Sequence, residues 1–123
     1  MLNAAFIIIG GAALLGAILA VLHMRAESVA SAPRQIGTIH GLLGIGGLGC
    51  LVWTLRGPPR GLDQGAASFG LISATLIALA AVVGGGIVVM HLLGRRLPGA
   101  LIGVHATVAI SGFVILAAYV LVG

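Results

Sequence analysis

The four histidines are the residues of this chain with the most versatile side-chain chemistry. Each lies seven residues from a glycine deeper in an apolar segment. The resulting pairs are His23 with Gly16, His40 with Gly47, His91 with Gly84, and His105 with Gly112. Because seven residues make about two helical turns, each glycine shares a helix face with its histidine. Imidazole is a common metal ligand, so a histidine beside a face without side chains could hold a flat ligand.

The composition places these histidines in a membrane. The chain has 123 residues, of which 60% are hydrophobic and 7% are charged, and its mean hydropathy is +1.27. Soluble domains carry about 25% charged residues. We therefore expect one integral membrane domain spanning residues 1–123 and surrounded by the lipid bilayer. The net charge of +4 comes from arginines between the apolar segments, which favours membrane orientation over nucleic-acid binding.

Four apolar segments predict four membrane-spanning helices, at about residues 2–24, 36–55, 66–93 and 97–122. Each is long enough to cross about 30 Å of hydrocarbon. Pro58 and Pro59 stop the second helix. Four helices with short connections predict an all-α, up-down bundle.

Arginine counting predicts the orientation of this bundle. Arg25, Arg34, Arg95 and Arg96 follow the first and third helices, whereas Arg56 and Arg60 follow the second. Because arginine favours the cytoplasmic side, both termini are expected on the non-cytoplasmic side of a bacterial inner membrane.

An internal repeat relates the two halves of the chain. The segment 16–23 aligns without gaps with the segment 84–91, from glycine to histidine in each case. The next helices repeat the pairs His40 with Gly47 and His105 with Gly112. This pattern predicts two copies of one helical hairpin around an axis along the membrane normal. All four histidines are then expected on the arginine-rich side.

Haem b is the cofactor that this layer of histidines fits, because its iron takes two axial ligands. His40 and His105 are the first candidate pair, and His23 and His91 are a second pair that would bind another haem or support the first. Small residues beside these ligands could accept a porphyrin edge; the candidates are Gly44, Gly47, Gly112, Gly16 and Gly84.

Other interpretations remain open. Histidines near a membrane surface can simply bond a backbone carbonyl, and glycine patterns commonly serve helix packing. The chain could then be a cofactor-free accessory subunit docked on a larger membrane complex, or a homo-oligomer. A metal-handling protein or small transporter is a third possibility. The sequence shows no paired carboxylates and no nucleophile with a base, so we expect no independent catalysis beyond a role as an electron-transfer subunit of an oxidoreductase.

The helix pattern, with one histidine in each helix, resembles the compact membrane cytochromes b, including four-helix haem-binding modules of bacterial respiratory chains. The segments 39–44 (IHGLLG) and 103–107 (GVHAT) also resemble small bacterial inner-membrane proteins. The resemblance implies one or two haems b and electron transfer. Those cytochromes commonly carry a haem near each membrane face, whereas these histidines gather on one side. Transfer across the whole bilayer would therefore need a second centre from a partner.

Overall fold

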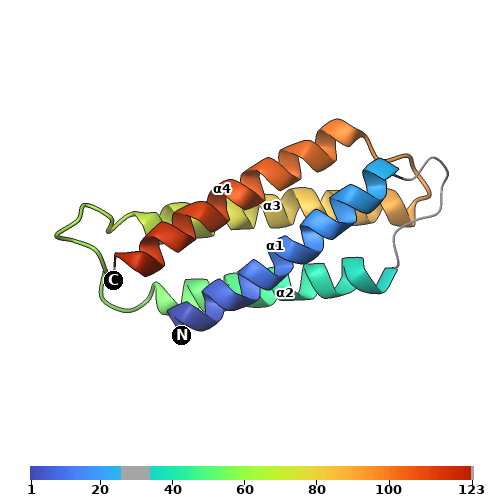
Figure 1. The fold of residues 1–123 in the computed structure, drawn as a ribbon. Helices are drawn as coiled ribbons and strands as arrows, with labels where there is room; N and C mark the ends of the chain where they lie inside the picture. The colour runs from blue at the N-terminus through green and yellow to red at the C-terminus, as the bar shows by residue number, and fades with distance from the viewer. Residues whose placement is uncertain (26–33, 123) are drawn as a thin grey trace.

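The computed structural model describes residues 1–25 and 34–122, and its regular structure there is entirely helical (Figure 1). The helices are α1 (Leu2–Arg25), α2 (Arg34–Thr54), α3 (Phe69–Leu92) and α4 (Gly99–Leu121). All four are long and apolar enough to cross a membrane. The sequence prediction of four such helices is confirmed to this extent.

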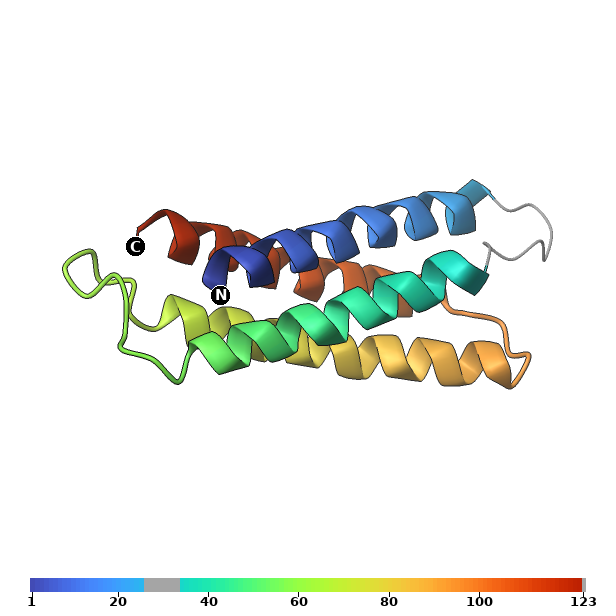
Figure 2. The ribbon, with the colours of Figure 1, turned by 90° about the horizontal axis from the view of Figure 1, so that it is seen from below.

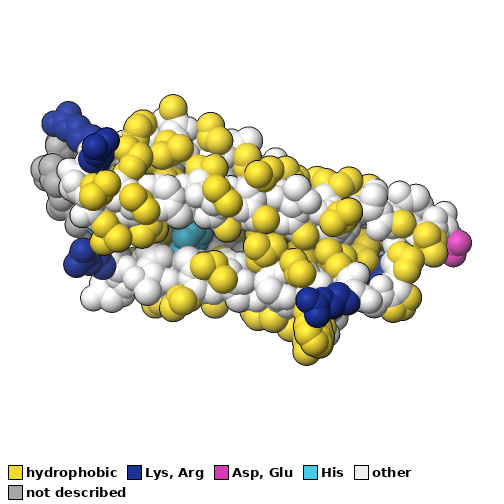
Figure 3. All heavy atoms as spheres, turned by 180° about the vertical axis from the view of Figure 1, so that it is seen from behind, with side chains coloured by type: hydrophobic (Ala, Val, Ile, Leu, Met, Phe, Trp, Pro, Cys, Tyr) yellow, Lys and Arg dark blue, Asp and Glu magenta, His cyan; other side chains and the backbone are white. Residues whose placement is uncertain are grey.

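The helices carry apolar side chains around their whole circumference, which distinguishes them from the helices of a soluble domain. Large hydrophobic side chains point away from the protein, for example Leu14 at 71%, Val82 at 74% and Val114 at 59% exposure. Figure 3 shows such side chains spread over the face seen there, with arginines gathered toward the ends. Water is a poor solvent for this surface, and lipid is a suitable one.

The helices pack side by side in an order that follows the chain. Helix α1 packs against α2 and α3 packs against α4, while α1–α4 and α2–α3 contacts complete the set (Figures 1 and 2). Helices α2 and α4 therefore occupy opposite corners. Both termini lie at the same end as the connection between α2 and α3.

The buried residues of the four helices are confined to one half of this arrangement. We call it the terminal half: residues 2–12, 47–54, 69–80 and 112–121. It contains the core, formed by Leu2, Ala5, Ile9, Leu51, Ala74, Ile77, Leu116 and Tyr119. Phe6 and Phe113 stack beside this core, with ring centroids 5.1 Å apart. The other half, here the histidine half, comprises residues 13–25, 34–46, 81–92 and 99–111.

The connection from α2 to α3 explains why α3 begins at Phe69, later than the expected residue 66. Gly61 adopts a φ of +68° and approaches Ala66 and Val122 closely, which favours glycine at this position. The backbone N–H of Ala66 donates to the carbonyl of Gly61 at 2.8 Å. These turns include residues 66–68, which the hydropathy pattern would place in the helix.

The two hairpins are built by the same contacts. A Cβ added at Gly47 of α2 would lie 2.5 Å from Cγ1 of Ile9, and one at Gly112 of α4 would lie 2.9 Å from Cγ1 of Ile77. Leu51 and Leu116 lie one turn further on and are fully buried. Because these positions correspond in the repeat, the repeat is a feature of the packing as well as of the sequence.

One buried hydrogen bond distinguishes the second hairpin from the first. The hydroxyl of Ser73 is fully buried and donates to the carbonyl of Gly112 at 2.8 Å, whereas Ala5 occupies the corresponding place in the first hairpin. We expect Ser73→Ala to destabilise the protein by about 1 kcal/mol in detergent unfolding. Thr75→Ala is the control, because Thr75 is exposed and bonds only within α3. Equal stability of the Ser73 variant and the wild type would contradict this prediction.

Candidate functional site

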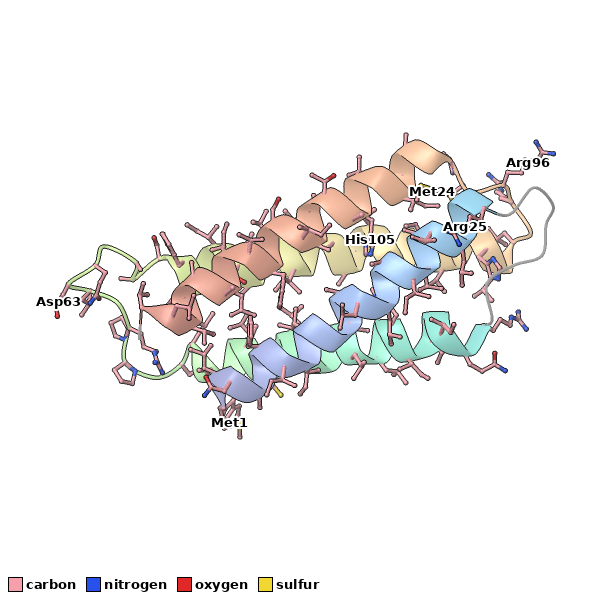
Figure 4. The ribbon with its side chains drawn as sticks, in the orientation of Figure 1. Met1, Met24, Arg25, Asp63, Arg96 and His105 are labelled. Atoms are coloured by element: carbon pink, nitrogen blue, oxygen red, sulfur yellow. The ribbon has the colours of Figure 1, made fainter. Side chains whose placement is uncertain are left out.

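Two imidazoles meet inside the histidine half. His40 of α2 and His105 of α4 have ring centroids 5.9 Å apart, and their planes are inclined at 78°. Their helices occupy opposite corners, so the rings approach each other across the middle of the arrangement. Figure 4 shows the His105 side chain directed inward from α4. Two residues that the sequence singled out as a pair are therefore neighbours in space.

Each of these rings is held by a backbone carbonyl of the adjacent helix. Nδ1 of His40 lies 2.8 Å from the carbonyl oxygen of Ala12, and Nδ1 of His105 lies 2.8 Å from that of Ala80. A carbonyl oxygen only accepts hydrogen bonds, so Nδ1 must carry the proton in both rings. In the neutral imidazole this leaves a lone pair on Nε2, the atom available to bind a metal ion or accept a proton.

Gly16 and Gly84 make room for the same rings. A Cβ at Gly16 would lie 2.9 Å from Cε1 of His40, and one at Gly84 would lie 3.0 Å from Cε1 of His105. The sequence pattern places Gly16 on the face of His23, in its own helix. In the structure Gly16 contacts His40 of the neighbouring helix instead, because the neighbours of a glycine depend on how the helices pack.

The other candidate glycines differ in their surroundings. Gly47 and Gly112 face Ile9 and Ile77, so they serve the close approach of helices within each hairpin. Gly44, one turn from His40, is half-buried, and a Cβ there would meet no atom of another helix within 4 Å. Of these three positions, only Gly44 borders open space.

His23 and His91 lie apart from this pair. They occupy the last turns of α1 and α3, and both side chains are exposed. Within residues 1–25 and 34–122, no group of three or more His, Cys, Asp or Glu side chains could hold a metal ion. The structure thus brings two of the four histidines together and does not gather all four into a cluster.

The histidine half is less buried than the rest. No described residue in it is fully buried, in contrast to the core of the terminal half. Exposed arginines lie at its end, namely Arg25 and Arg34 within it, and Arg95 and Arg96 in the connection from α3 to α4. In Figure 4, Arg25 and Arg96 lie at the end opposite to Asp63. The imidazole pair therefore lies between a dense apolar core and a cationic surface.

Comparison with protein-family models, curated proteins and solved structures found no match for this chain.

Sequence reasoning missed the two hydrogen-bond acceptors, the carbonyls of Ala12 and Ala80. A backbone acceptor has no side chain that marks it in a sequence. Both carbonyls lie one helical turn before a glycine of the repeat, Ala12 before Gly16 and Ala80 before Gly84.

Proposed function

We propose that this chain is a haem-b-binding electron-transfer protein or subunit, with His40 and His105 as the axial ligands of one iron. The observation that carries the proposal is a pair of imidazoles with centroids 5.9 Å apart, whose Nδ1 atoms are both occupied by carbonyls. A porphyrin supplies four ligands to its iron, so two protein ligands suffice. A structural zinc ion needs four protein ligands and a catalytic one needs three. Among residues 1–25 and 34–122 no third ligand joins the pair, which favours haem over a bare metal ion.

The surrounding residues fit this cofactor. A hydrogen bond from Nδ1–H to a carbonyl orients a ligating histidine and raises the basicity of Nε2. A Cβ at Gly44 would meet nothing within 4 Å, so a planar group could lie against this glycine, one turn from His40. When bound, haem supplies one-electron exchange, and the apolar helices exclude water from it. Exposed His23 and His91 are outside the proposed site, so we propose one haem for each chain.

A cofactor-free accessory subunit is the second candidate. The same hydrogen bonds would also fasten α2 to α1 and α4 to α3, and the rings already occupy the gaps left by Gly16 and Gly84. In that case the histidines serve helix packing alone, and the chain would assemble with a second copy or with a larger membrane complex.

A reduced-minus-oxidised absorption spectrum of the detergent-purified protein distinguishes these candidates. The haem proposal predicts sharp α and Soret bands in material that elutes as a folded species. Folded protein without these bands would exclude the haem proposal and favour the accessory subunit.

We further propose that the four helices form a bundle in a bacterial inner membrane, with both termini on the non-cytoplasmic side. The arginine excess at the histidine end favours placing this end in the cytoplasm. In a Cys50→Ala background, Asp63→Cys should react with an impermeant thiol reagent in spheroplasts. Arg96→Cys, at the opposite end (Figure 4), should react only after lysis. The reverse labelling pattern would overturn the orientation.

A further inference from the structure

His40 and His105 make their hydrogen bonds to equivalent positions of α1 and α3. Ala12 precedes Gly16 by one helical turn in α1, and Ala80 precedes Gly84 in the same way in α3. In an α-helix the carbonyl of residue i accepts the amide of residue i+4. The carbonyl that receives each imidazole is thus the one that also faces the amide of the glycine. The ring lies beside this carbonyl in the space that a side chain at the glycine would occupy.

We propose that Gly16 and Gly84 are positioning residues, each forming with the carbonyl one turn earlier a seat for the imidazole of the neighbouring helix. The seat fixes two properties of the ring. The carbonyl selects the tautomer with the proton on Nδ1, and the missing Cβ permits the ring rotation at which Nδ1 reaches that carbonyl. Two such seats leave both Nε2 atoms free and hold the ring planes nearly perpendicular.

The surroundings of the glycines favour this role over ordinary helix packing. At Gly47 and Gly112 a Cβ would approach aliphatic side chains and the backbone of the adjacent helix. At Gly16 and Gly84 the three nearest atoms all belong to an imidazole. The same imidazole contacts occur in both hairpins.

What the seated imidazoles bind rests on the proposed haem function, but the seats can be tested without haem. Nitrogen-15 NMR of histidine-labelled, haem-free protein reports the tautomer of each ring. His40→Ala and His105→Ala identify their own signals. We expect both rings to carry the proton on Nδ1. Protonation on Nε2, or fast exchange between the two tautomers, in the wild-type protein would overturn the inference.

Glycine variants test the seats in the haem-loaded protein. Perpendicular axial imidazole planes give a more anisotropic low-spin electron paramagnetic resonance signal than parallel planes. We expect this signal in the wild type, and we expect Gly16→Ala and Gly84→Ala each to shift it or convert it to a high-spin signal. Gly85→Ala is the matched control, because Gly85 is exposed and a Cβ there meets nothing within 4 Å.

The outcomes separate this inference from the haem proposal. An unchanged signal in both seat variants would overturn the inference while the haem proposal stands. Absence of haem from the wild type would overturn the haem proposal, and the nitrogen-15 spectrum would still decide whether the seats exist.

Discussion

Replacement of His40 or His105 by alanine is expected to abolish haem binding. Each histidine supplies one of two axial ligands, and loss of a group that merely supports a metal ligand already costs about 10–100-fold in affinity. Loss of the ligand itself should therefore lower the haem content of purified protein by more than about tenfold. The haem content of each variant, measured as pyridine haemochrome per chain, checks this expectation.

His23→Ala and His91→Ala are the matched controls for this experiment. Both residues are exposed in the last turns of their helices, away from the pair, so these variants should retain the wild-type haem content. Intact haem in the His40→Ala, His105→Ala double variant would contradict our choice of ligands. Loss of haem in the controls as well would contradict the restriction of the site to one pair.

Substitution of Gly47 or Gly112 by valine is expected to have the largest effect on stability. A Cβ at Gly47 would lie 2.5 Å from the Cγ1 of Ile9 and 3.2 Å from its backbone nitrogen. At Gly112 the corresponding distances to Ile77 are 2.9 Å and 3.3 Å. Because backbone atoms cannot rotate away as the tip of a side chain can, the two helices must move apart. Overpacking of this kind costs about 1–3 kcal/mol or more.

Unfolding in mixed detergent micelles measures this loss. Gly41→Val is the control, since Gly41 lies in the same helix as Gly47, is exposed, and a Cβ added there would meet no atom of another helix within 4 Å. It should leave the free energy of unfolding nearly unchanged. An equal loss in Gly41→Val would show that the helix backbone, and not the contact with Ile9, requires glycine.

The existence of four long apolar helices followed from the sequence more readily than the details of the site. Hydropathy located four helices because lipid selects for continuous apolar segments of sufficient length. The repeat also pointed to His40 and His105 as equivalent residues, and their rings lie 5.9 Å apart. Whether these two residues ligate haem stays a prediction.

The neighbours of the glycines could not be predicted from spacing alone. A seven-residue interval describes one helix, whereas the contact of Gly16 with His40 depends on how α1 and α2 pack. The acceptors at Ala12 and Ala80 are backbone atoms and leave no mark in side-chain patterns. The late start of α3 at Phe69 depends on the positive φ of Gly61 and Gly65, which hydropathy does not detect.

The haem stoichiometry of the wild-type protein tests the central claim most directly. The pyridine haemochrome assay, combined with the protein concentration from amino-acid analysis, gives the number of haems b for each chain. One haem per chain is the result expected for a single site between His40 and His105. Folded protein without haem would contradict the claim, and two haems per chain would show that a second pair of ligands exists.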